Sequence, residues 1–375
     1  MAYQSKGRFN AKEKSTYIIM HGEKKVASVN TSGKCEIYEK NYMPYNLYME
    51  AEAQEFDELF NNLSNFYFWC ASRMLTLDRT YAKEILNSIG VSQAVTDKER
   101  AHIALSYHCV VLTDIYWVKE FDEPVTFAEI NLYENHLDNA FVDVSLRGRQ
   151  MTIENSTLIA DDLSTGGMFP KAWIRESDGF YLLKDGGMDA VHREVLASKV
   201  SQCFKCNQVY YEESNYKGEP VSKSKIITSV KYSLVSREAF DIYAKNQDID
   251  VMEFIKKLDS INYYTMNIID YLIGNTDRHW GNWGFLVDNQ TNQPVRLYNL
   301  MDFNRAFSAY DTIDGANCLT VSGTGKKTQL EAAVEAVCQI GFHPIAEAKE
   351  EWFAGKKSWY EMFQKRWEIL EQCKR

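Results

Sequence analysis

The chain has 375 residues, of which 45% are hydrophobic and 25% are charged, and these ordinary proportions exclude a disordered chain. Its formal net charge of −10 argues against a general binder of nucleic acids or membrane surfaces, so we expect small molecules and proteins as partners. No apolar run reaches the roughly 18 residues of a membrane span, and the polar start lacks the apolar core of a signal peptide. We therefore expect a cytoplasmic location without membrane contact.

Residues 1–148 are predicted to form a first unit. The stretches 15–30 and 34–39 read as short strands joined by polar turns, which indicates a small sheet. Helical patterns follow over 53–75, 79–91 and 96–112. The last begins at Thr96, a plausible N-cap with Glu99 three residues on. We expect these helices to cover the sheet.

Residues 149–232 are predicted to be rich in strands, with one helix. Near their start lies a turn of small residues, through which backbone N–H groups could approach an anion such as phosphate. This turn consists of Ser164, Thr165, Gly166 and Gly167. A hairpin follows, "KAWIRE" turning at Asp178 and Gly179 into "FYLLK". By itself the glycine turn is a weak signal of phosphate binding, because most such turns only reverse the chain direction.

The second strand of this hairpin ends at Lys184, and a helix is predicted to follow from Asp189. Glu194 borders the apolar stripe of that helix, so the lysine on the strand could meet the glutamate on the helix. A lysine held by a carboxylate can contact the α and β phosphates of ATP in a fixed position. The alternative is an incidental ion pair on the surface.

The third region, 233–375, is predicted to be largely helical apart from one hairpin. It contains "GNTDRHWGNWGF", in which Asp277 precedes Asn282 by five residues, as in the catalytic loop of protein kinases. A strand, a polar turn and a returning strand then lead to Asp302. Because a hairpin brings its ends together, Asn282 and Asp302 should lie side by side and offer two oxygen ligands to Mg²⁺.

These motifs resemble those of the HipA-like serine/threonine kinases of bacteria, which share features of the catalytic loop with phosphatidylinositol kinases. Four stretches carry the resemblance: "STGGMFPK" (164–171), "LLK" (182–184), "NTDRHWGNWGF" (275–285) and "LMDFN" (300–304). They span about residues 150–310, and the start of the chain looks more loosely like the family's small N-terminal sheet. The stretches 43–54 and 105–120 depart from the family's best-known branch, so neither the substrate nor an antitoxin contact carries over.

The resemblance implies a role for each matched residue. Asp277 would be the catalytic residue, Asn282 and Asp302 would bind Mg²⁺, and Lys184 would contact the ATP phosphates with Glu194 as its partner. The other implied ATP-binding residues are Ser164, Thr165, Gly166, Gly167, Lys171 and His279. Ser164 also matches the position where family members can phosphorylate themselves and eject the loop; the alternative is that its hydroxyl merely caps the turn.

The resemblance also implies an α+β fold with two lobes like those of protein kinases. The N-terminal lobe would be rich in sheet and carry an extra small β/α subdomain, and the C-terminal lobe would be mainly helical. The predicted domains are an N-terminal subdomain, 1–148, and a kinase core, 149–375, whose nucleotide-binding lobe ends at about 232. The helical lobe would occupy 233–375.

We expect an ATP- and Mg²⁺-dependent kinase that phosphorylates serine or threonine in proteins, itself included, as the toxin of a toxin–antitoxin-like system. One alternative is a pseudokinase-like module that holds a partner such as a DNA-binding antitoxin, and another is a kinase of lipid or small-molecule hydroxyls. Direct binding of nucleic acid is not expected. Catalysis is favoured because a binding module does not need Lys184, Asp277, Asn282 and Asp302 together.

Several other residues receive structural interpretations. His192 is expected to be exposed on its helix, and Trp280 and Trp283 to pack beneath the loop. Cys203 and Cys206 have CxxC spacing but lack a second ligand pair, so packing is favoured over zinc binding. The aromatic C-terminal stretch 351–372 is expected to close the helical lobe.

Overall fold

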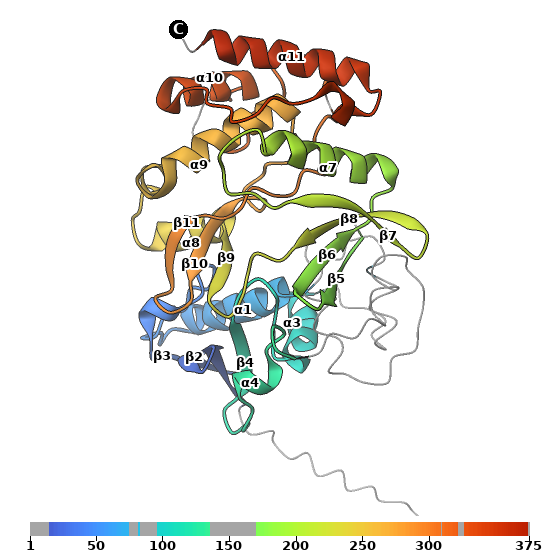
Figure 1. Ribbon diagram of the computed structural model, residues 1–375. Coiled ribbons are helices and arrows are strands. Elements are labelled where there is room, and N and C mark those ends of the chain that lie inside the picture. The colour runs from blue at the N-terminus through green and yellow to red at the C-terminus, as the bar shows by residue number, and fades with distance from the viewer. Residues whose placement is uncertain are drawn as a thin grey trace, which may run out of the picture.

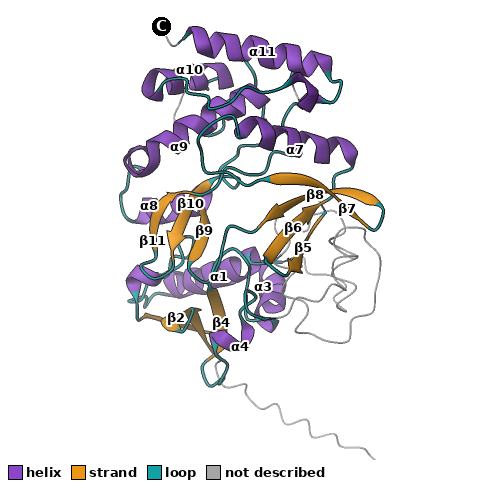
Figure 2. Cartoon of the chain, in the orientation of Figure 1, coloured by secondary structure: helices purple, strands orange, loops and turns teal. Residues whose placement is uncertain are grey.

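The computed structural model describes residues 15–74, 82, 96–135, 170–308, 310–321 and 326–373. Figure 1 shows three layers: the N-terminal sheet with α1 and α3, then two further sheets, and then a group of helices that includes α7, α9, α10 and α11. Figure 2 shows the same separation between strands and the C-terminal helices. The predicted α+β class is therefore confirmed. Of the helix predicted over 79–91 the structure describes residue 82 alone, and the turn at 164–167 lies outside the described residues.

The N-terminal unit, residues 15–74 and 96–135, contains a four-stranded sheet in the order β3-β2-β1-β4. Its elements are β1 (Thr16–His21), β2 (Lys24–Asn30), β3 (Cys35–Ile37), η1 (Lys40–Tyr42), α1 (Phe56–Ser72), α3 (Asp97–Ser106), β4 (Tyr116–Glu120) and α4 (Phe127–Ile130). The capping box of Thr96 and Glu99 is confirmed. The sequence analysis did not predict β4, which pairs with β1 in antiparallel orientation.

The second sheet has the order β5-β6-β8-β7 and carries one helix, α7. Its elements are β5 (Lys171–Glu176), β6 (Gly179–Lys184), α7 (Met188–Ser201), β7 (Tyr211–Tyr216) and β8 (Glu219–Lys225). The predicted hairpin is confirmed, with Lys171 opposite Lys184 and Glu176 opposite Gly179. Cys203 is buried just beyond α7 in the same core as Val200, and Cys206 packs against that core, as the favoured packing role predicts.

The third region combines a three-stranded sheet, β11-β10-β9, with long helices. Its elements are β9 (Tyr232–Ser236), α8 (Arg237–Asn246), α9 (Val251–Ile273), β10 (Gly284–Asp288), β11 (Gln293–Leu297), α10 (Gln329–Ile340), η3 (Glu350–Phe353) and α11 (Lys357–Gln372). Every residue of α9 from Tyr263 to Ile273 is buried. In the C-terminal stretch, Phe353 and Phe363 are buried in the same core, so its predicted role in closing the helical lobe is confirmed.

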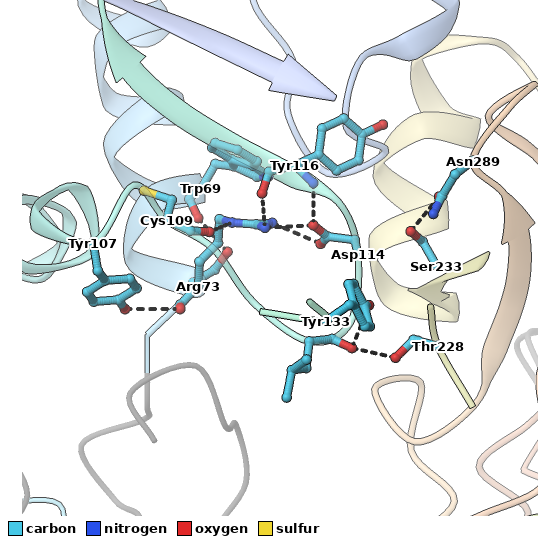
Figure 3. Close-up of polar contacts among 12 residues, drawn as sticks. Trp69, Arg73, Tyr107, Cys109, Asp114, Tyr116, Tyr133, Thr228, Ser233 and Asn289 are labelled. Carbon is cyan, nitrogen blue, oxygen red and sulfur yellow. Dashed lines mark hydrogen bonds and ion pairs between the residues drawn. The ribbon is translucent and has the colours of Figure 1, made fainter. Parts of the chain in front are cut away.

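An arginine of the N-terminal unit anchors the loop between α3 and β4 (Figure 3). Arg73 donates two hydrogen bonds to the Asp114 carboxylate, at 2.9 and 2.7 Å, and one to the backbone oxygen of Cys109. The carbonyl of Leu112, in that loop, accepts a hydrogen bond of 2.5 Å from Thr228 Oγ1, between β8 and β9. The N-terminal unit therefore holds the connection between the second and third sheets.

The N-terminal unit also holds the turn between β10 and β11. Asn292 in that turn is 3% exposed, and its carbonyl accepts a 2.7 Å hydrogen bond from the hydroxyl of Tyr45. Its side chain donates to Asn41 O at 2.9 Å and accepts from the hydroxyl of Tyr116 at 3.2 Å.

Among the described residues, no helix combines the length and apolar character needed to cross a membrane.

Candidate functional site

A buried group of charged residues joins β6, α7 and the segment after β11. The Nζ atom of Lys184 lies 2.7 Å from Glu194 Oε1 and 3.1 Å from Asp302 Oδ1. The other carboxylate oxygen of Glu194 accepts a 2.5 Å hydrogen bond from Ser222 Oγ on β8. We call Lys184, Glu194, Asp302 and Ser222 the Lys184 cluster. The lysine and glutamate are thus a buried pair, not an incidental ion pair on the surface.

The side chains of Lys184 and Glu194 are buried, that of Asp302 is 26% exposed, and the charges of the cluster compensate each other. Burial disfavours the ammonium ion of Lys184, but Asp302 and Glu194 outweigh that effect and raise the pKa of Lys184 well above its ordinary value. Burial likewise disfavours the carboxylate of Asp302, but Lys184 and then Lys171 lower the pKa of Asp302 to about 2. Both groups are therefore charged at neutral pH.

Local structure explains why Lys184 and Glu194 meet. β6 ends at Lys184, and the chain reverses through Gly187, whose φ of 79° is costly for residues with a side chain. α7 then begins at Met188 and presents Glu194, which is 2% exposed, to the sheet. Gly187 and the apolar stripe of α7 thus fix the approach of the glutamate.

The polar loop after α9, residues 274–283, is the second half of the site; we call it the Asp277 loop. It begins at Gly274, which ends α9 with φ 58° and whose replacement by a larger residue would clash with Tyr310. It leads into Gly284, where a Cβ atom would lie 2.2 Å from the carbonyl oxygen of Val235 on β9. These two glycines let the loop leave a buried helix and enter a buried strand.

A buried arginine organises the Asp277 loop. Arg278 is 2% exposed, and its Nε donates to Asp270 Oδ2 at 2.9 Å. Its Nη1 donates to the carbonyls of Asn282 and Met301, at 2.9 and 2.5 Å. One guanidinium nitrogen therefore holds both ends of the β10–β11 hairpin. The predicted approach of the two ends is confirmed at the backbone.

Asp277 and Asn282 face each other across the loop. The Nδ2 atom of Asn282 donates a 2.8 Å hydrogen bond to the carbonyl of Asp277, so the amide oxygen takes no part in this contact. The Asp277 carboxylate is half-buried, and burial together with the negative charge of Asp302 raises its pKa. Asp302 itself has a left-handed backbone, with φ 61°. The carboxylates of Asp277 and Asp302 therefore lie close enough for the charge of one to raise the pKa of the other, and Asn282 contacts the backbone of Asp277.

Of the other predicted site residues, the structure describes Lys171 and His279. Lys171 is half-buried opposite Lys184, close enough to lower the pKa of Asp302. His279 is exposed, and its Nδ1 accepts a 3.0 Å hydrogen bond from the backbone of Gly281. Ser164, Thr165, Gly166 and Gly167 lie outside the described residues.

The expectation that His192 is exposed was wrong: it is half-buried, with its ring centroid 6.4 Å from that of Trp359. The sequence around His192 could not show that Trp359, in the distant C-terminal segment, packs against its ring. Trp283 is buried against Tyr263, as expected, whereas Trp280 is half-buried and donates to Leu319 O at 2.9 Å.

The sequence analysis missed four residues that support the site. Ser222 bonds to Glu194, and the hydroxyl of Tyr211 accepts a 3.2 Å hydrogen bond from the backbone of Asp302. Arg278 and Asp270 fix the loop. The only signal for this pair was Asp270, an acid inside the apolar run "MNIIDYLI", because such a residue requires a buried partner.

A cavity of about 310 Å³ borders the Asp277 loop. Its lining includes Gly281 and Met301, the neighbours of Asn282 and Asp302 in sequence, and also Tyr45 and Arg73 of the N-terminal unit. The N-terminal unit therefore shares a cavity with residues next to the site.

A sheet-bearing lobe with a lysine–glutamate pair, followed by a helical lobe with an acidic loop and an Asp-bearing hairpin, has the architecture of a kinase-like fold. Shewanella oneidensis MR-1 HipA, solved in complex with HipB and operator DNA, is similar in structure: the TM-score is 0.52 at 11% sequence identity, with 96% of this chain and 99% of that chain covered. This similarity shows the fold alone.

A second solved structure, the Helicobacter pylori proinflammatory kinase CtkA, has a TM-score of 0.43 and 15% identity, with 56% of this chain and 92% of that chain covered. No family model matches the chain, and no curated protein matches it in sequence.

Proposed function

We propose that this protein is an ATP-dependent phosphotransferase whose acceptor is a serine or threonine hydroxyl of a protein. The observation that carries the proposal is the Lys184 cluster, in which a buried lysine is held between Glu194 and Asp302. A lysine with this restraint can bind phosphate oxygens without losing much freedom, and Asp302 places a carboxylate beside them. The kinase-like fold supports the same reaction.

The residues present fit Mg²⁺. The low pKa of Asp302 keeps its carboxylate charged, and Asn282 offers an amide oxygen. Among the described residues, no group of three or more histidine, cysteine, aspartate or glutamate side chains could hold a metal. Two protein ligands suit Mg²⁺, which commonly completes its coordination with phosphates and water. When bound, the ion would neutralise charge on the phosphates.

Asp277 is proposed to orient the acceptor hydroxyl. Its raised pKa reflects burial and the neighbouring Asp302 charge, and this suits a group that accepts a proton during transfer. His279 is exposed beside it and is proposed to face the nucleotide. Ser164, Thr165, Gly166, Gly167 and Lys171 are proposed to cover the ATP phosphates, with Ser164 as a site of self-phosphorylation.

The test is incubation of the purified protein with γ-labelled ATP and Mg²⁺, followed by mapping of phosphate on the protein and on added peptides. Asp277→Ala should lower transfer by several orders of magnitude while ATP binding persists, because positioning of the nucleophile is lost and the metal ligands remain. Asp311→Ala, at an exposed position, is the matched control and should keep transfer. Equal transfer in both variants would remove Asp277 from the mechanism.

The same incubation separates the alternatives. A pseudokinase-like module would bind ATP or a partner without transfer, and a kinase of lipid or small-molecule hydroxyls would transfer only to those acceptors. We further propose a protein partner of the antitoxin type, on the basis of the HipB and operator DNA in the Shewanella complex. With a net charge of −10, this chain alone should not retard DNA in a gel-shift assay.

A further inference from the structure

We infer that Trp359 on α11 is a positioning residue that holds α7 in the orientation in which Glu194 restrains Lys184. The inference rests on the proposed function for its effect on transfer, but the contacts that carry it are independent of that function. Trp359 lies in the C-terminal stretch, far in sequence from α7 and from the Asp277 loop.

Trp359 stacks on two different parts of the site. Its ring lies 5.1 Å from the Phe307 ring at an interplanar angle of 11°, and 6.4 Å from the His192 ring at 22°. Phe307 belongs to the segment that follows Asp302, and His192 belongs to α7. A single indole ring therefore connects the helix that bears Glu194 with the segment that bears Asp302.

The geometry of α7 gives this contact its effect. Residues two apart on a helix point about 200° apart, so His192 and Glu194 lie on nearly opposite faces. Glu194 is attached to Lys184 and Ser222 on the sheet, while the His192 ring rests on Trp359 and its Nδ1 lies 3.9 Å from Glu213 Oε1 on β7. α7 is thus held by the sheet and by α11.

Polar contacts follow the same path. Arg193 Nη1 donates to Ser308 Oγ at 3.3 Å, and Lys356 Nζ lies 3.6 Å from Asp189 Oδ1. Both contacts are exposed, so each adds little free energy. They nonetheless join the first two turns of α7 to Ser308, which follows Phe307, and to Lys356, which precedes Trp359.

Phe307 also needs an external contact. Its φ of 57° places a bulky side chain in the left-handed region, and its N–H donates to Ile273 O at 2.8 Å. Trp359 stacks on the Phe307 ring in the position that this backbone conformation gives it. Removal of the indole should therefore loosen the segment after Asp302 as well as α7.

The test compares Trp359→Ala with Trp367→Ala, a matched truncation on the same helix. Trp367 contacts the rings of Phe204, Phe342 and Phe363, none of which lies on α7. Amide hydrogen exchange of the full chain without nucleotide should rise on the order of tenfold across 190–196 in Trp359→Ala and not in Trp367→Ala. Trp359→Phe should restore most of the protection, because a flat ring remains.

A second arm uses ATP turnover. On a Glu194→Gln background, Trp359→Ala should lose most of its effect on kcat/KM for ATP, whereas Trp367→Ala should act as it does in wild type. Equal exchange across 190–196 in the two tryptophan variants would overturn the inference, whatever the turnover. Selective loosening of α7 in a protein without phosphoryl transfer would instead support the inference and overturn the proposed function.

Discussion

Replacement of Lys184 by Met removes the only cation of the Lys184 cluster and leaves two carboxylates behind. Glu194 is 2% exposed, so solvent cannot stabilise its charge once the lysine is gone. Loss of one partner from a buried ion pair typically costs about 3–5 kcal/mol. We expect Lys184→Met to lower the free energy of unfolding by that amount at neutral pH.

The Asp302 part of this cost follows from its pKa. A fall from 3.8 to about 2, at about 1.36 kcal/mol per pH unit, corresponds to ~2.4 kcal/mol. The side chain is 26% exposed, and solvent screening reduces the figure to about 2 kcal/mol. Because the folded pKa is depressed, wild type has this stability above the unfolded pKa and loses it as the pH falls from about 4 to about 2.

Lys184→Met lacks the share of that contribution that Lys184 supplies, while the share from Lys171 remains, so the stability gap between the two proteins should be largest near neutral pH and should narrow in acid. Urea denaturation followed by tryptophan fluorescence at several pH values measures the gap. Lys199→Met, an exposed position on the same helix as Glu194, is the control and should change stability by less than about 0.5 kcal/mol. If both variants match wild type at neutral pH, the cluster does not stabilise the fold.

Three further outcomes are expected. Asp302→Asn should weaken ATP binding in calorimetric titrations with Mg²⁺ and change it little in chelator, whereas equal losses would indicate misfolding. Tyr45→Phe removes the buried hydrogen bond to Asn292 and should cost about 1–2 kcal/mol in urea denaturation, against less than about 0.5 for the more exposed Tyr48→Phe. Ser164→Asp should weaken ATP binding if phosphate on that loop silences the enzyme, and unchanged affinity with no phosphate mapped at Ser164 in wild type would refute self-silencing.

Local sequence patterns were sufficient to predict the β5–β6 and β10–β11 hairpins, the cap at Thr96 and the helix that bears Glu194. The turn at Asp178 and Gly179 joins strands that are adjacent in sequence, and the capping box at Thr96 is a signal within four residues. Such elements depend on interactions between near neighbours, which a sequence displays directly. The position of Lys184 relative to Glu194 was predictable for the same reason.

Two strands were missed because their signals are not local. In β4, Tyr116, Trp117 and Val118 are all buried, so the run lacks the alternation of a half-exposed strand. β9 pairs with β10, which is distant in sequence: Val235 lies opposite Phe285. The sequence shows that such segments are apolar but does not show which partner they choose.

The conformation of the site is less predictable than its residues. Asp302 and Phe307 both have left-handed backbones, at φ 61° and 57°, and each costs about 1–2 kcal/mol for a residue with a side chain. Contacts from distant parts of the chain hold them: Tyr211 accepts from the backbone of Asp302, and Trp359 covers Phe307. The motif "LMDFN" can therefore identify the carboxylate, but the backbone that presents it is imposed by residues 91 positions earlier and more than 50 later. A change at either distant residue should alter the site while every residue of the motif stays in place.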